Sequence, residues 1–239
     1  MRVIGVIPAR MGSSRFPGKP LVAIGGRPMI EHVYRGTVAC ALVDEVVVAT
    51  CDAEIARAAA GFGARVIMTS AAHERASDRV AEACERLEAD VAVMVQGDEP
   101  MVQPGMIAAT AQPLLENPRI DCVNLAASIR TETESLDPNT IKVVISRSGQ
   151  AMYFSRRAIP AGVVPGEMFK QVCVIGFRRH SLRQFARLPQ GPLERAESID
   201  MLRFLENDRP VHMVITPVQT QAVDTPDDRD RVAVLMGLD

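Results

Sequence analysis

The chain has almost no excess of charge of either sign. Its 239 residues include 27 basic and 29 acidic side chains, and the formal net charge is −2. Proteins that bind nucleic acid or anionic membranes through a general electrostatic attraction need a clear excess of positive charge. We therefore expect neither nucleic acid nor a membrane as a partner, and look for cations in local motifs instead.

Long hydrophobic runs and paired cysteines are also lacking. No run approaches the roughly 18 apolar residues that a membrane-spanning helix needs, and the apolar stretch Val3 to Ile7 is too short for a signal peptide and is followed by Pro8. The five cysteines are odd in number and form no CxxC pair. They predict reduced thiols with no zinc site or disulfide framework, which is typical of a cytoplasmic protein.

Apolar residues make up 47% of the chain, enough for a sizeable core. In the first half, β-branched runs alternate with helical patterns, which predicts an α/β fold with a mostly parallel central sheet and ligands at the carboxyl ends of its strands. After Pro118 strands predominate, with a hairpin turn at Ser148 and Gly149. The expected strands span 3–7, 45–49, 64–68, 91–95, 123–129, 141–146, 151–154, 171–177 and 211–216, and the expected helices span 28–42, 53–61, 77–87, 192–206 and a segment from 225.

The loop after the first expected strand, residues 8–20, carries the strongest functional signal. Arg10, Arg15 and Lys19 place three cations within ten residues, while Gly12 lets backbone amides approach a ligand and Ser13 adds a donor. Such a loop can neutralise a triphosphate. It lacks the GxxxxGK[ST] pattern of a Walker A loop and the GxGxxG of dinucleotide folds. The alternative is an exposed basic loop without a ligand.

As a whole, the pattern IPAR-x-x-S-x-R-x-PGKP closely resembles the signature loop of the 3-deoxy-manno-octulosonate (Kdo) cytidylyltransferases, also called CMP-Kdo synthetases. The resemblance runs nearly to the C-terminus. It implies a nucleotidyltransferase fold in one domain, residues 1–239, with a nucleotide-binding core (1–120 and 211–239) and a small β-rich lobe (121–210) for the acceptor and for homodimerisation. The implied reaction joins the CMP part of CTP to a small acidic acceptor and releases pyrophosphate. The implied CTP-binding residues of the loop are Ala9, Arg10, Gly12, Ser13, Arg15 and Lys19, with Lys19 also catalytic.

Two acidic motifs predict a magnesium site. Asp98 follows an expected buried strand in VQGDEP, and Asp224 precedes an expected helix in VDTPDD. On their own, Asp98 fits an ordinary turn, and the second motif fits a helix start with Asp224 or Thr225 as N-cap. The family resemblance implies that both aspartates are catalytic Mg²⁺ ligands, which suits an ion that takes few protein ligands and keeps phosphate oxygens and waters.

The nucleotide pocket is expected to include residues 73–79. The family usually has His-x-Ser-Gly-Thr-Asp/Glu-Arg here, and this chain has Arg75 and Ala76 at the Ser and Gly positions. Ser77 and Arg79 still match, and Gln96 matches a nucleotide-contacting position. The alternative for this stretch is a capped helix start.

On the acceptor side Asn139, Lys142, Arg156, Glu194 and Glu197 match the family, and Asp200, with Met201, stands where the family helix usually reads Glu-Gln. All of these residues except Met201 are expected to bind the acceptor. Arg156 offers a planar fork for an anion, with a surface salt bridge as the alternative. The family's His and Tyr residues that usually face the sugar are missing from QVCVIGF, which predicts that unmodified Kdo is a poor acceptor. An 8-amino-Kdo-like ulosonate or a small phosphonate such as phosphonoformate fits instead. A metal-dependent glycosyltransferase and a non-catalytic nucleotide sensor are the competing classes. The basic loop argues against the first, and the intact aspartate pair against the second.

Overall fold

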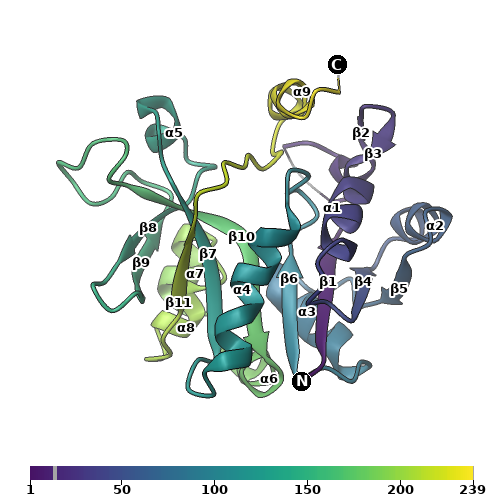
Figure 1. The fold of residues 1–239 in the computed structure, drawn as a ribbon, viewed down its shortest axis with the longest axis horizontal. Helices are drawn as coiled ribbons and strands as arrows, with labels where there is room; N and C mark the ends of the chain where they lie inside the picture. The colour runs from purple at the N-terminus through teal and green to yellow at the C-terminus, as the bar shows by residue number, and fades with distance from the viewer. Residues whose placement is uncertain (13–14, 239) are drawn as a thin grey trace.

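The computed structural model describes residues 1–12 and 15–238, within which nine strands form one mixed sheet (Figure 1). The strands of this sheet are β1 (Val3–Ala9), β4 (Glu45–Thr50), β5 (Arg65–Met68), β6 (Val91–Val95), β7 (Cys122–Ser128), β8 (Lys142–Ile145), β9 (Ala151–Ser155), β10 (Phe169–Arg178) and β11 (His212–Thr216). A separate hairpin contains β2 (Ala23–Ile24) and β3 (Arg27–Pro28). The helices are η1 (Lys19–Leu21), α1 (Met29–Val38), α2 (Ala53–Gly61), α3 (Ala76–Glu85), α4 (Pro104–Glu116), α5 (Glu132–Leu136), α6 (Arg179–Arg187), α7 (Pro192–Glu197), α8 (Leu202–Leu205) and α9 (Pro226–Leu235).

The central strands confirm the predicted parallel sheet. β1 lies between β4 and β6 and is parallel to both, and β5 continues the parallel order beyond β4. Every residue of β1 and of β6 is buried, as expected for strands covered on both faces. One departure is β10, which runs antiparallel between β6 and β7 and links the parallel half of the sheet to the lobe.

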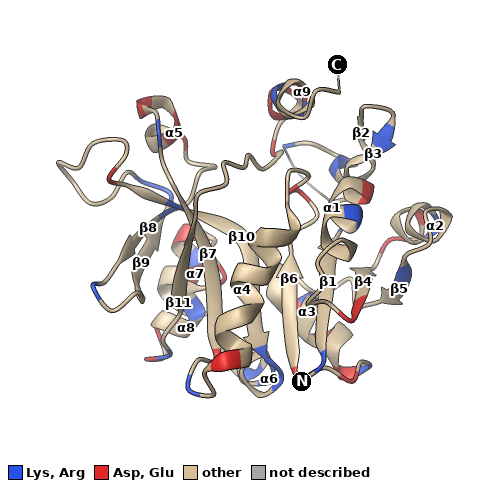
Figure 2. Ribbon diagram, in the orientation of Figure 1, with Lys and Arg blue, Asp and Glu red and all other residues tan. Residues whose placement is uncertain are grey.

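Helices cover both faces of the sheet and define two large cores. One core joins the sheet to α3, α6 and α8 through residues such as Val80, Phe185 and Phe204. The other joins the opposite face to α1, α2 and α4 through residues such as Ile30 and Ile107. Charged residues lie mainly on helices, loops and strand ends rather than in the middle of the central strands (Figure 2). No helix in the described part of the chain is long and apolar enough to cross a membrane.

The lobe contains the predicted hairpin of β8 and β9, and Gly149 in its turn has a φ of 77°. The predicted single helix over 192–206 is wrong. The chain forms α7 and α8 instead, because Ser198 takes the left-handed conformation with φ 54° and ends α7. The helices α4, α5 and α6 were not predicted.

The topology gathers the functional segments at one edge of the sheet. β1 and β6 are parallel neighbours, so the first loop after Ala9 and the turn containing Asp98 emerge side by side. The link between β11 and α9 crosses this edge, where the Val223 amide donates to the Asp98 carbonyl oxygen at 2.9 Å. α9 then packs against the β2–β3 hairpin through a third small core that includes Ile24, Val223 and Val232.

Candidate active site

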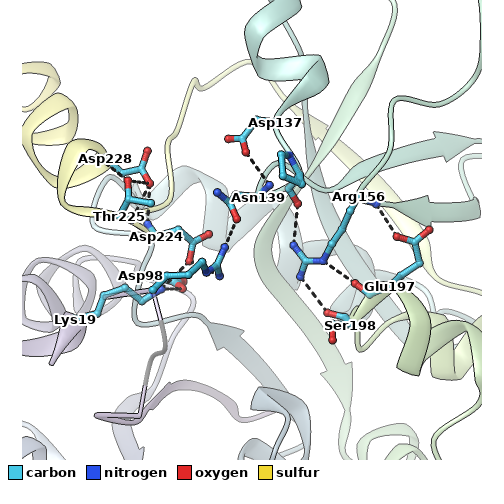
Figure 3. Close-up of polar contacts among 12 residues, drawn as sticks. Lys19, Asp98, Asp137, Asn139, Arg156, Glu197, Ser198, Asp224, Thr225 and Asp228 are labelled. Atoms are coloured by element: carbon cyan, nitrogen blue, oxygen red, sulfur yellow. Dashed lines mark hydrogen bonds and ion pairs between the residues drawn. The ribbon is translucent and has the colours of Figure 1, made fainter. Parts of the chain in front are cut away.

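A lysine and two aspartates form the centre of the site (Figure 3). Nζ of Lys19 lies 2.8 Å from Oδ2 of Asp98 and 3.0 Å from Oδ1 of Asp224. Arg15 reaches the same Asp224 oxygen at 2.9 Å. Burial alone would lower the pKa of Lys19, but the two carboxylates outweigh burial and raise that pKa above its ordinary value. Three separate segments of the chain therefore meet in one charged cluster.

The aspartate pair fits a magnesium ion. Oδ1 of Asp98 is buried and has no hydrogen-bond partner among the described residues, which leaves one carboxylate oxygen available to a cation. Within residues 1–12 and 15–238 no group of three or more His, Cys, Asp and Glu side chains could hold a metal by itself. Mg²⁺ is commonly held by one or two carboxylates together with substrate phosphates and waters. Two aspartates next to the basic first loop match that donor set.

The Asp224 side chain is not used as a helix cap, because other residues cap the helix that follows it. Thr225 is the N-cap of α9, and its hydroxyl accepts the Asp228 amide at 3.2 Å. In the reciprocal hydrogen bond, the Asp228 carboxylate accepts the Thr225 amide at 2.9 Å, and the two bonds together form a capping box. The predicted capping role thus belongs to Thr225, while the Asp224 side chain points to the cluster.

Glu99 is a buried acid that the sequence interpretation missed. Its Oε1 accepts the Cys173 amide at 3.2 Å, and its Oε2 accepts the Thr220 hydroxyl at 3.0 Å. Burial, followed by the nearby Asp98 carboxylate, raises the pKa of Glu99 to about 7. The side chain therefore joins the turn that contains Asp98 both to β10 and to the segment that carries Asp224. An acid directly after Asp98 in VQGDEP was the available sequence signal.

A cavity of about 490 Å³ lies over the first loop. Its walls include seven of the predicted CTP-binding residues: Ala9, Arg10, Gly12, Arg15, Lys19, Arg79 and Gln96. Ser77 does not line it; the side chain is fully buried, and its hydroxyl donates to Oδ2 of Asp200 at 2.8 Å. The predicted role of Ser13 lies outside the described residues.

A second cavity, of about 590 Å³, lies on the acceptor side. Asn139, Arg156 and Asp200 line it as predicted, and Gln171 and Cys173 from β10 contribute to its walls. The two cavities share five lining residues: Arg15, Gln96, Asp98, Asp200 and Asp224. Asp98 and Asp224 therefore stand where a group from one cavity would meet a group from the other.

Arg156 reaches the acceptor cavity as an anchored cation (Figure 3). Its Nε donates to the Glu197 carbonyl oxygen at 2.6 Å, Nη1 to that of Pro138 at 2.9 Å and Nη2 to that of Ser198 at 3.3 Å. A guanidinium has five N–H donors, so two remain for a ligand. The carbonyl contacts fix the orientation of the fork and connect the 137–139 turn to the end of α7.

Three residues that were expected to bind the acceptor lie away from the cavity walls. Lys142 is fully buried, and its ammonium donates to the carbonyl oxygens of Asp137 and Thr140. Glu194 is also fully buried and pairs with Arg203 at 2.7 Å. Glu197 accepts the Arg156 amide at 2.8 Å and the Ser155 hydroxyl. Burial favours such internal pairing for these charges, so they support the loops instead of touching a ligand.

Comparisons with known proteins agree with this geometry. A cytidylyltransferase family profile matches residues 4–213. The 3-deoxy-manno-octulosonate cytidylyltransferase of Geobacter sulfurreducens is 43% identical, with 97% of this chain and 98% of the relative covered. The protein of the same name from Syntrophotalea carbinolica is 44% identical over the full length of both chains.

Solved structures give the same result. A CMP:2-keto-3-deoxy-manno-octonic acid synthetase complexed with CTP superposes with a TM-score of 0.91, at 37% identity and with 99% of each chain covered. The 4-diphosphocytidyl-2C-methyl-D-erythritol synthase of Anaerococcus prevotii, with 14% identity, a TM-score of 0.69, and 99% of this chain and 96% of that one covered, shares the fold. By sequence and by structure, the chain is a nucleotidyltransferase that belongs to the cytidylyltransferase family, alongside the Kdo cytidylyltransferases.

Proposed function

We propose that the protein transfers CMP from CTP to a 2-ulosonate of the Kdo type and releases pyrophosphate. The observation that carries the proposal is the meeting of two cavities at Asp98 and Asp224, one cavity walled by the basic first loop and the other by the Arg156 cation. The related 3-deoxy-manno-octulosonate cytidylyltransferases and the structural neighbour, which is complexed with CTP, support the same substrates.

The first loop provides the charge that a triphosphate needs. Arg10, Arg15 and Lys19 all line the nucleotide cavity, and Lys19 is held next to the aspartates by its two ion pairs. In the proposed reaction the β- and γ-phosphates leave as pyrophosphate, and these cations stabilise the negative charge that grows on the leaving oxygen. A sugar diphosphate would need fewer cations, which disfavours the glycosyltransferase alternative.

Asp98 and Asp224 would hold Mg²⁺ against the phosphates. The ion would supply charge neutralisation and would make the attacking hydroxyl more acidic, so the proposal requires no dedicated side-chain base. The residues of the chain position the two aspartates. The Thr225 cap and the hydrogen bonds of Glu99 fix the segment that places Asp224 opposite Asp98.

The acceptor cavity positions the attacking group. The two remaining N–H donors of Arg156 suit the carboxylate of a 2-ulosonate, and the amide of Asn139 lies nearby as a further polar group. If Arg156 holds the acceptor by its carboxylate, a hydroxyl of the acceptor stays free to approach the α-phosphorus in line from the acceptor cavity. Positioning of this kind lowers the barrier by removing the entropy cost of the encounter.

Asp200 favours a ulosonate over a small phosphonate. Its side chain lines both cavities, and its Oδ1 receives no hydrogen bond from any described residue. A phosphonate dianion at the junction would meet this carboxylate and be repelled, whereas a hydroxyl or an ammonium group would be attracted. The expectation that unmodified Kdo is a poor acceptor remains a prediction.

Pyrophosphate release tests the proposed function. The protein is mixed with CTP, Mg²⁺ and a 2-ulosonate. The released pyrophosphate is converted to phosphate by pyrophosphatase, and the phosphate is measured. Asp98→Asn serves as the matched control, since it keeps the volume and removes the charge. Turnover with CTP and a 2-ulosonate that the control lacks supports the proposal. Failure of the wild-type chain with every ulosonate would refute it.

A further inference from the structure

Two arginines at the start of α3 bring unsatisfied donors to the nucleotide cavity. Arg75 and Arg79 both line it. Arg79 is 3% exposed; its Nη1 donates to the hydroxyl of Thr69, and its Nη2 is buried without a hydrogen-bond partner among the described residues. Nε of Arg75 is likewise buried and makes no hydrogen bond there. Buried donors of this kind are rare in folded proteins and need an explanation.

Arg75 is held in place by a buried counter-ion. Its Nε lies 3.5 Å from Oε1 of Glu194, which is fully buried. Glu194 is itself fixed by two bonds from Arg203, whose guanidinium also pairs with Asp78 on α3. The chain Arg75–Glu194–Arg203–Asp78 ties α3 to α7 and α8. The charge of Glu194 is shared with Arg203. The contact between Glu194 and Arg75 therefore orients the Arg75 guanidinium without using all of the Arg75 donors.

The outer end of the Arg75 side chain remains available to a ligand. No described residue accepts a hydrogen bond from its Nη1 or Nη2, and neither atom is among the buried unpartnered ones. The terminal nitrogens are therefore accessible, on a residue that lines the cavity. Together with Arg79, Arg75 makes this wall rich in donors. A ligand group that fits it must be rich in acceptors.

We propose that Arg75 is a specificity-determining residue that reads the cytosine base of the nucleotide. The inference rests on the proposed function insofar as the nucleotide is CTP. The cations of the first loop and the aspartate pair take the triphosphate, which leaves the wall formed by residues 73–79 to the nucleoside. On the cytosine ring, O2 and N3 are adjacent acceptors, and the two N–H groups of a guanidinium fork match such a pair.

Uracil presents a different edge to the same fork. Its N3 carries a hydrogen and is a donor, so one guanidinium N–H would face another N–H and lose its partner. A site built to hydrogen-bond one group rejects an analogue that cannot make the bond. Arg75 therefore favours CTP over UTP.

The test compares equilibrium binding of CTP and UTP to the intact protein by isothermal titration calorimetry. The variants are Arg75→Ser, Arg75→Lys and, as the matched control, Arg183→Ser on the exposed side of α6. Arg75→Ser should weaken CTP binding about tenfold or more while changing UTP binding little, because a bidentate base contact gives discrimination of that size. Arg75→Lys keeps the charge but lacks the fork, and should lose most of the preference as well. Arg183→Ser should retain it.

The outcomes separate the inference from the proposed function. An equal loss of CTP and UTP binding in Arg75→Ser would mean that Arg75 contacts phosphate or ribose, and would overturn the inference. An unchanged preference in Arg75→Ser would also overturn it, and if that variant fails to fold, Arg75→Lys gives the same readout. A wild-type protein that binds neither CTP nor UTP would instead contradict the proposed function.

Discussion

Nζ of Lys19 lies 2.8 Å from Oδ2 of Asp98, so a lysine ammonium contacts a carboxylate that we expect to bind metal. The same ammonium lies 3.0 Å from Asp224. Lys19 and a divalent cation therefore compete for the same two carboxylates until triphosphate offers Lys19 another partner. Ion binding and CTP binding should consequently assist each other, with the same coupling factor in both directions.

The first prediction follows from this competition. Lys19→Met should strengthen Mn²⁺ binding in the absence of nucleotide by about fivefold or more, because an internal competitor is removed, yet it should lower turnover by removing a cation from the leaving group. Electron paramagnetic resonance of free Mn²⁺ measures the binding. Asp98→Asn, which removes a ligand, should weaken Mn²⁺ binding under the same conditions. Weaker Mn²⁺ binding in Lys19→Met would contradict the account.

The second prediction concerns Glu99, whose carboxylate joins Cys173 to Thr220. Glu99→Ala leaves two donors without their acceptor and loosens the segment that presents Asp224, so the Mg²⁺ concentration for half-maximal activity should rise about tenfold. Glu99→Gln keeps one carbonyl acceptor and should fall between Ala and wild type. Thr220→Val removes only one bond and should have a smaller effect in the same direction. Identical Mg²⁺ dependence in all four proteins would exclude the positioning role.

Asp200 gives a third prediction. The change Asp200→Asn preserves an oxygen that can accept the Ser77 amide and hydroxyl, so the start of α3 should stay intact. It removes the charge next to the acceptor. An ammonium on the acceptor would lose an attractive partner, so kcat/KM should drop about tenfold for 8-amino-Kdo and much less for Kdo. Equal drops for the two sugars, measured in parallel, would show that Asp200 does not read the amino group.

The positions of Asp98 and Asp224 at the ends of their elements could be predicted because each follows a local rule. Their role as Mg²⁺ ligands came from the family resemblance and stays a prediction. Asp98 ends a buried parallel strand and Asp224 precedes a capped helix, and neighbouring parallel strands bring their carboxyl ends to one edge. Residues whose roles depend on tertiary burial could not be assigned in this way. Lys142 looked like a free cation on a strand, but its ammonium is used by two carbonyls. The break at Ser198 was hidden because the apolar spacing continues across it.

The fourth prediction is the homodimer expected for the 121–210 lobe. Within the described residues, β9 pairs only with β8, and Met152 on it is 64% exposed. An edge strand with an exposed apolar residue is a ready surface for association. Light scattering at micromolar concentration should give about twice the chain mass of 25.9 kDa. Met152→Asp should shift the protein toward monomer, and Val38→Asp on α1, also exposed, should not; a monomeric wild type would contradict the prediction.

The acceptor panel tests the central claim most directly. Pyrophosphate release with CTP and Mg²⁺ is measured side by side for Kdo, 8-amino-Kdo and phosphonoformate, each as kcat/KM. The account predicts turnover with the ulosonates, the amino sugar exceeding Kdo by about tenfold, or 1.4 kcal/mol, and little turnover with phosphonoformate. Kdo ahead of its amino analogue would correct the acceptor preference alone. A higher kcat/KM for phosphonoformate than for both ulosonates would contradict the proposed function.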